Sequence, residues 1–544
     1  MVLRNVYLFG VQALLALCLL TAVIMAPTAH AQGIDPALLA VLAQGDTSAR
    51  LDAFTLLGRE PGVMAPAVLE AMREGRLYSA PDGHVYILTR DGKALDPAAG
   101  LAAVLPADAS RLTINNRLRR ALDGALAMSG LQSDDPAVRL AAAQRMQQGG
   151  AENRAAIEAA LAKEEGGDIR DALHIALAVL QLNSVNAADR IAAVKALGDT
   201  DSAGFRPRLE KLLAQDSSGQ YQEPDVAVRA AADVAIKKID RHLTTIEWVG
   251  NVFYGLSLGS VLLLASLGLA ITFGLMGVIN MAHGELLMIG AYVTYLMQLF
   301  FRAYLPNSMG WYVVAALPAA FLAAAVVGMA LERTVIRWLY GRPLETLLAT
   351  WGISLMLIQG ARSIFGAQNV EVANPAWMSG GLTVLGDLVL SYNRIVIVVF
   401  SILVVAFVWL LLNHTRLGLF MRAITQNRRM ADCVGVPTGR IDMLAFGLGS
   451  GIAGLGGVAL SQLGNVGPDL GRAYLVDSFM VVVLGGVGQL AGTVTAAVGL
   501  GAVNKLMEPY TGAVIAKITI FALIVLFIQA RPQGLFAPRG RSVE

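Results

Sequence analysis

A succession of long apolar segments fills the chain after Trp248 and restricts what it can fold into. Each segment is close to the roughly 20 residues that an α-helix needs to cross a bilayer. The segments run at about 250–273, 285–301, 311–331, 345–365, 393–413, 440–463, 474–488, 490–507 and 514–530. The sequence therefore predicts an all-α polytopic membrane domain over 248–544, with about 8–9 transmembrane helices. The glycine-rich region 464–489 could instead be re-entrant, which would lower the number of full crossings.

Arginine-rich loops predict the orientation of these segments, because cytoplasmic loops carry an excess of Lys and Arg. The arginines fall in two loops and a tail, at Arg333, Arg337 and Arg342, at Arg416, Arg422, Arg428, Arg429 and Arg440, and at Arg531, Arg539 and Arg541. The loops at 302–310, 366–392 and 464–473 are poorer in positive charge and are expected outside. With nine crossings, every arginine-rich loop lies in the cytoplasm and every loop that is poor in positive charge lies outside. The C-terminus is then in the cytoplasm.

Residues 1–31 have the pattern of a secretory signal peptide, with Arg4, an apolar stretch over 6–25 and Ala29-His30-Ala31 before the cleavage point. An uncleaved first membrane helix is the alternative. Cleavage would export the next segment and leave Cys433 as the remaining cysteine. We therefore expect no disulfide and no cysteine metal site.

Residues 32–247 contain most of the Asp, Glu and Lys and are predicted to form a soluble, mainly α-helical extracytoplasmic domain. Alternation around Pro81-Asp82-Gly83 predicts one small β-hairpin, 76–80 with 84–89. Segments starting at Asp135, Asp189 and Asp225 resemble one another, with an Asp near the helix start and a nearby Arg. They predict HEAT-like helical repeats, although alanine-rich helices can also look alike without sharing a repeat.

A polar interruption, Asn280-Met281-Ala282-His283-Gly284-Glu285, separates the first two apolar segments. One ionised residue at the bilayer centre costs roughly 2.5–3.5 kcal/mol. The interruption is therefore either a loop at the membrane surface or a broken helix that lines a polar path. Neighbouring glycines favour the broken helix, and Asn280, His283, Gly284 and Glu285 are candidate pathway residues.

Two further regions suggest function. The basic stretch 415–440 is long for a helix connection and contains a short helical pattern, followed by Asn427-Arg428-Arg429. Its apolar positions need a partner surface. After the glycines of 447–457, Gln462, Asn465 and Asp477 are further pathway candidates. Asp477 is either an acid in the first turn of a helix at the interface or a pore residue.

The motif at 280–285 with Gly290-Ala291-Tyr292, the loop at 415–440 and the run 481–488 resemble the permeases of branched-chain amino acid-type ABC importers. The resemblance covers about residues 250–535. Segments 464–471 and 474–479 and the exported extension resemble the urea-transporting branch of that family. By resemblance, Arg422, Ala423, Asn427, Arg428 and Gly435 belong to the loop that couples to the ATPase.

The resemblance implies several partners in a bacterial inner membrane: a second, homologous permease subunit, two cytoplasmic ATPase subunits and a periplasmic substrate-binding protein. No phosphate-binding Gly-x-x-x-x-Gly-Lys-Ser/Thr motif occurs in the chain, so ATP would be hydrolysed by the partners and the chain needs no cofactor. The formal net charge of +2 averages two unlike halves and indicates no nucleic-acid binding.

The expected function is a permease for urea or a short amide, with a branched-chain amino acid as the alternative. Asn280, His283 and Glu285 could supply hydrogen-bond donors and acceptors to either class. A passive channel would need the same polar break without a docking loop. An enzyme is disfavoured because His283-Gly284-Glu285 lacks the second histidine of a metalloprotease motif.

Overall fold

The computed structural model describes residues 34–536, except 61, 63, 90, 151, 152 and 385–387, and it gives no description of the side chain of residue 275. The predicted signal peptide, 1–31, lies outside the described residues. The chain forms two compact units that divide between His242 and Leu243, within one helix. The sequence had suggested a division between 247 and 248.

The first half of the N-terminal unit packs four helices with a small antiparallel sheet. The helices are α2 (Pro36–Gln44), α3 (Thr47–Arg59), α4 (Met64–Arg73) and α5 (Asn116–Gly130). The predicted hairpin is confirmed as β1 (Leu77–Ser79) and β2 (Val85–Leu88), with Leu77 opposite Ile87. Three further strands complete the order β4-β3-β2-β1-β5: β3 (Ala94–Asp96), β4 (Leu101–Ala103) and β5 (Ser110–Arg111). Strands this short give too little alternation to be recognised in a sequence.

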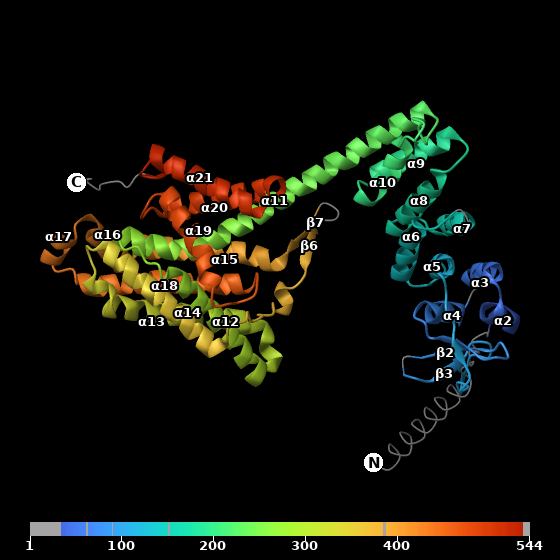
Figure 1. The fold of residues 1–544 in the computed structure, drawn as a ribbon, viewed down its shortest axis with the longest axis horizontal. Helices are drawn as coiled ribbons and strands as arrows, with labels where there is room; N and C mark the ends of the chain where they lie inside the picture. The colour runs from blue at the N-terminus through green and yellow to red at the C-terminus, as the bar shows by residue number, and fades with distance from the viewer. Residues whose placement is uncertain are drawn as a thin grey trace, which may run out of the picture. The chain divides into compact units, whose positions relative to one another are not determined.

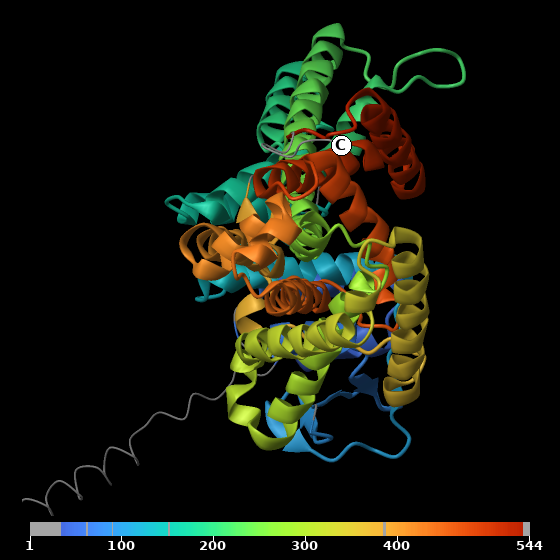
Figure 2. The ribbon, with the colours of Figure 1, turned by 90° about the vertical axis from the view of Figure 1, so that its left-hand side faces the viewer.

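The second half of this unit is a succession of helices that pack in turn (Figure 1). They are α6 (Pro136–Met146), α7 (Arg154–Lys163), α8 (Asp168–Gln181), α9 (Ala187–Asp199), η2 (Ala203–Phe205), α10 (Arg206–Leu213) and the first part of α11 (Val226–Met276). Between α10 and α11 the chain makes a long turn, which Figure 2 shows extending from the green helices. It is closed by a bridge between Gln215 and Tyr221.

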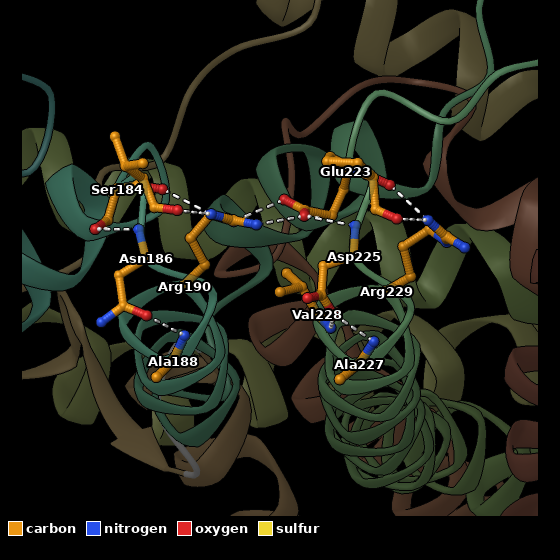
Figure 3. A network of polar contacts seen from close by, with 11 residues as sticks. Ser184, Asn186, Ala188, Arg190, Glu223, Asp225, Ala227, Val228 and Arg229 are labelled. Carbon is orange, nitrogen blue, oxygen red and sulfur yellow. Dashed lines mark hydrogen bonds and ion pairs between the residues drawn. The ribbon is translucent and has the colours of Figure 1, made fainter.

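One arginine contact recurs at the start of four of these helices. Arg139, Arg170, Arg190 and Arg229 each donate from Nη1 to the carbonyl six residues earlier, at 2.6–3.0 Å. Figure 3 shows two of these contacts side by side, at Arg190 and Arg229. The sequence comparison missed the copy at Arg170, whose helix begins after a glycine instead of an Asp. In α9 the cap itself is Asn186, and Asp189 lies in the first turn, near the helix start as predicted. The shared contact supports a repeat, and its HEAT-like character stays a prediction.

The membrane unit continues α11 and adds ten helices among the described residues. They are α12 (His283–Tyr304), α13 (Tyr312–Thr334), α14 (Pro343–Phe365), α15 (Tyr392–His414), α16 (Arg416–Gln426), α17 (Arg428–Cys433), α18 (Thr438–Ser461), α19 (Leu470–Gly485), α20 (Leu490–Thr511) and α21 (Ala513–Ala530). Short 3₁₀ turns, η3 (Pro306–Trp311), η4 (Ile336–Trp338) and η5 (Ala376–Met378), and a hairpin of β6 (Gly381–Val384) with β7 (Leu388–Ser391) lie between them.

In the described part of the chain, eight helices are long and apolar enough to cross a membrane, which agrees with the predicted fold class. Helix α19 falls short of this length, with 16 residues. At a rise of 1.5 Å per residue it measures about 24 Å, less than the roughly 30 Å of a hydrocarbon core.

Helix α18 is largely enclosed within this unit, and its glycines explain why. A Cβ atom on Gly290 of α12 would lie 2.1 Å from the carbonyl oxygen of Gly454, and one on Gly268 of α11 would lie 2.2 Å from that of Gly449. Both contacts are possible only without a side chain, because glycine lets two helix backbones touch. Helix α18 is thus held against α11 and α12 by direct backbone packing.

Candidate functional site

The predicted polar interruption is a break between two membrane-length helices. Helix α11 ends at Met276, and α12 begins at His283. Gly277 turns the chain with a φ of +64°, a conformation that glycine adopts without strain. The side-chain carbonyl of Asn280 then accepts a hydrogen bond from the N–H of Ala282 at 3.0 Å, which closes the turn into the new helix. Glu285 lies in the first turn of α12, which starts three residues after Asn280.

The break lies inside the membrane unit. Asn280, His283 and Glu285 are 2%, 0% and 2% exposed. A loop in open water would leave these polar side chains accessible. Of the two explanations open from the sequence, the geometry matches a broken helix within the protein.

Helix α14 supplies the polar partners of the break. Ser354 donates from Oγ to Glu285 Oε1 at 2.7 Å, and the hydroxyl of Thr350 accepts a hydrogen bond from the N–H of Met281 at 3.1 Å. Both hydroxyl residues are buried and lie one turn apart on the same face of α14. The sequence analysis missed them. Their spacing of four residues, within the apolar central part of the helix, is the signal that would have found them.

Three polar atoms at the break have no partner among the described residues: Asn280 Nδ2, His283 Nδ1 and Glu285 Oε2. His283 Nε2 contacts the carbonyl of Ala265 at 2.8 Å. Because a carbonyl can only accept, Nε2 carries the proton, and in a neutral ring Nδ1 is then a free acceptor. The break thus offers both a donor, the Asn280 amide, and two acceptors to a polar ligand.

Backbone contacts fix the position of the break. A Cβ atom on Gly284 would lie 2.6 Å from the carbonyl oxygen of Gly471, and one on Gly471 would lie 1.9 Å from that of Gly284. The starts of α12 and α19 therefore touch backbone to backbone. Two charged residues at the start of α19, Asp469 and Arg472, act electrostatically on the Glu285 carboxylate. Asp469 also pairs with Arg362 of α14 at 2.8 Å.

An aromatic pair lies two turns further along α12. The ring of Tyr292 stacks on that of Phe365, with centroids 4.2 Å apart. Tyr292 is 3% exposed, and its hydroxyl has no partner in the described structure. The sequence analysis used this tyrosine only as part of a motif.

The other predicted pathway residues do not contact this break. Gln462 ends α18, where its Oε1 accepts a hydrogen bond from the Tyr312 hydroxyl at 3.4 Å. Asn465 is exposed in the following loop. Asp477 pairs with Lys517 of α21 at 2.8 Å. The idea that Asp477 lies in a first helical turn was wrong, because α19 begins seven residues earlier, at Leu470.

The predicted coupling stretch forms two short helices, α16 and α17. The side chain of Asn427 caps α17 by accepting from the N–H of Met430 at 3.0 Å, and Gly435 has a φ of +88°. Arg422 is exposed and donates to the carbonyl of Leu412, whereas Ala423 is half-buried. Arg428 forms an ion pair with Asp442 of α18.

Both helices also leave large apolar side chains accessible. Leu419, Met430 and Val434 are 56%, 60% and 71% exposed. The opposite face, with Met421 and Ile424, is buried in the membrane unit. The stretch therefore presents a mixed apolar and basic surface.

No three His, Cys, Asp or Glu side chains in the described part of the chain gather in a way that could hold a metal ion. The chemistry that the side chains of this site offer is hydrogen bonding and charge.

Comparison with known proteins places the membrane unit in a family. The pattern of the family described as "Branched-chain amino acid transport system / permease component" matches residues 251–528. The chain is 28% identical over 295 residues to the high-affinity branched-chain amino acid transport system permease protein BraD of Pseudomonas aeruginosa, covering 53% of this chain and 95% of that protein. It is also 28% identical over 291 residues to LivH of Escherichia coli, covering 52% and 94%.

A weaker likeness extends to sugar transport. The galactose/methyl galactoside import permease protein MglC of Escherichia coli is 28% identical over 193 residues, which cover 33% of this chain and 55% of that protein. No solved structure gives a significant match.

Proposed function

The chain belongs to the family of permease components of branched-chain amino acid transport systems, and on that premise we propose that its buried polar break lines the route of the transported solute. The relatives are permease components of transporters, not enzymes. The chain is accordingly the permease component of an ABC-type transporter, and the eight membrane-length helices among its described residues fit the multi-pass inner-membrane proteins of this family. The further steps below are our proposal.

The observation that carries the proposal is the unsatisfied polar chemistry of the break. A buried polar atom without a partner costs about 1–3 kcal/mol. Folding alone gives no reason to retain Asn280 Nδ2, His283 Nδ1 and Glu285 Oε2 in that condition. A solute that supplies a donor and an acceptor during its passage would satisfy them transiently.

A branched-chain amino acid is the substrate class that the relatives favour. Such a solute carries an ammonium group, a carboxylate and an apolar side chain. Glu285 could accept from the ammonium group, and Arg472 could attract the carboxylate. The stacked rings of Tyr292 of α12 and Phe365 of α14 offer an apolar surface two turns further along α12.

Urea or a short amide is the second candidate. It is favoured by the likeness of segments 464–471 and 474–479 to the urea-transporting branch, and by the N-terminal unit, which lies outside the residues matched by the family pattern. Urea is neutral and would use the amide of Asn280 and the acceptors of His283 and Glu285 without needing Arg472.

The partners follow from the family and from the surface of α16 and α17. A membrane permease of an ABC importer works with ATPase subunits and a substrate-binding protein. We assign the exposed apolar residues Leu419, Met430 and Val434, with the arginines beside them, to the contact with the ATPases. A second, homologous permease subunit would complete the membrane part.

The proposed orientation places the N-terminal unit outside and the C-terminus inside. It requires α19 to cross the membrane despite its 16 residues, since otherwise the arginines after Ala530 would lie outside. A reporter enzyme fused after residue 536 tests this directly, because activity of a cytoplasmic reporter supports the crossing and activity of a periplasmic reporter overturns it.

Uptake measurements test the function. Cells that lack this chain, and the same cells with it restored, should be given radiolabelled leucine and radiolabelled urea in turn. Restored leucine uptake supports the amino acid, and restored urea uptake supports the second candidate. Uptake of neither solute above the deletion strain, with the protein present in the membrane, would contradict both.

A further inference from the structure

A polar cluster joins three helices and a loop at the end of the membrane unit where the arginine-rich loops lie. Arg428, the first residue of α17, pairs with Asp442 of α18, and its guanidinium carbon lies 4.5 Å from the centre of the Tyr340 ring. The Tyr340 hydroxyl donates to Glu332 Oε1 of α13 at 3.1 Å. Asp442 and Glu332 are 2% and 1% exposed, whereas the side chain of Arg428 remains 40% exposed.

Stability does not account for two enclosed carboxylates at this position. An ion pair that includes a buried charge is often no more stabilising than apolar residues of similar volume, because removing the charge from water is costly. Glu332 Oε2 has no partner among the described residues. Asp442 is near the start of α18, but no backbone N–H donates to its carboxylate in the described structure, so helix capping does not explain it either.

Helix α18 connects this cluster to the polar break. A Cβ atom on Gly457 of α18 would lie 2.0 Å from the carbonyl oxygen of Leu287, one turn after His283 in α12. The contact between Gly454 and Gly290 is equally close. Packed backbones have no flexible side chains between them to absorb a shift, so a displacement of α18 at Asp442 also displaces the start of α12.

We propose that the ion pair of Arg428 with Asp442 transmits movement of α16 and α17 to α18 and thereby to the polar break. The ring of Tyr340 contacts the guanidinium group of Arg428, and Glu332 holds Tyr340 through its hydroxyl, so both residues help to position Arg428. These four are positioning residues that do not touch the solute. The inference rests on the proposed function, in which α16 and α17 contact the ATPases.

The test uses the complete importer, reconstituted in liposomes with its binding protein, and measures both radiolabelled solute uptake and ATP hydrolysis. The solute is leucine or urea, whichever the wild-type assembly carries. Two variants remove the link, Arg428→Gln and Asp442→Asn. The second keeps the side-chain shape and removes the buried negative charge. The ion pair is therefore lost without leaving an unpaired charge in the protein interior. Arg531→Gln is the control, because Arg531 is another exposed arginine, lies outside the stretch 415–440, and its side chain forms no hydrogen bond or ion pair with the described residues.

We expect Arg428→Gln and Asp442→Asn to reduce the solute carried per ATP hydrolysed by about five- to tenfold, the size of a typical coupling between sites. ATP hydrolysis and the amount of assembled complex should persist, and Arg531→Gln should leave the ratio unchanged. Exchanging the charges, Arg428→Asp together with Asp442→Arg, should recover part of the ratio. A purely structural pair would lower the amount of assembled complex instead.

An unchanged ratio in Arg428→Gln and Asp442→Asn, or an equal loss in Arg531→Gln, would overturn the inference while leaving the proposed function intact. Absence of ATP-dependent uptake by the wild-type assembly would overturn the proposed function, and the inference with it. The two failures are thus distinguished by the wild-type measurement.

Discussion

The network around Arg190 in the N-terminal unit and the polar break in the membrane unit differ in whether their buried polar groups are hydrogen-bonded. Arg190 donates to the carbonyls of Ser184 and Val185 and to both oxygens of Glu223 (Figure 3). At the break, Asn280, His283 and Glu285 each retain a buried polar atom without a partner among the described residues.

The difference separates a structural use of polar residues from a functional one. A satisfied network fixes loops and helix ends, so its loss should change stability without changing transport. An unsatisfied group weakens the fold and is retained where a ligand needs it, so its loss should change transport without lowering stability. The predictions below test this separation, starting with the largest expected effect.

Replacing Glu285→Gln should reduce uptake by about tenfold or more, because hydrogen bonds to a charged group contribute roughly 1.5–3 kcal/mol. Glutamine has the same length and can still accept from Ser354, so the amount of protein in the membrane should not change. Uptake is measured against the protein level in membranes. Normal uptake at a normal protein level would show that Glu285 does not line the route of the solute.

Replacing Ser354→Ala should reduce uptake severalfold, less than Glu285→Gln, because the carboxylate stays in place and loses only one of its hydrogen bonds. The change takes away the donor that orients the Glu285 carboxylate. Ser363→Ala is the control on the same helix, since Ser363 is exposed and bonds only to the Gln359 carbonyl in the described structure. An equal loss in both variants would show a general effect on α14.

Replacing Arg190→Gln should make the region 184–229 more sensitive to limited proteolysis of the full-length protein, with uptake per molecule unchanged. The change leaves Glu223, which is 5% exposed, without its cation. Arg154→Gln is a matched control, because its ion pair with Glu158 is about half exposed and contributes little. Reduced uptake per molecule in Arg190→Gln would contradict the proposed distinction between structural and functional polar residues.

Acidification should produce the smallest effect, at the start of α3. Hydrogen bonds from the N–H of Ala49 and the hydroxyl of Ser48 hold the pKa of the Asp46 carboxyl below its usual value. A lowered pKa in the folded state means that the contribution to stability is present above the unfolded pKa, about 3.9. It is lost as the pH falls through the folded pKa. Hydrogen exchange at the first turn of α3 should rise in that range, and Asp46→Asn, which keeps the cap without titrating, should abolish the rise.

Local patterns in the sequence predicted the elements that depend on neighbouring residues. Apolar length predicted the membrane helices, alternation predicted the β1–β2 hairpin, and the Asn280–Glu285 motif predicted a break between helices. Each depends on a few adjacent residues, so its signal is present in the chain itself. Strands of two or three residues and the copy of the arginine contact at Arg170 were missed because their local signal is weak.

The sequence by itself determined that polar residues interrupt a membrane helix and that a basic loop follows further along. Only the tertiary structure decided which of these residues meet. It brought Ser354 to Glu285 and Asp442 to Arg428, and it kept Asp477 apart, with Lys517. Contacts between helices depend on how backbones approach at glycines such as Gly290 and Gly454, which are far apart in the chain, and helical periodicity within one segment carries no information about the face it meets.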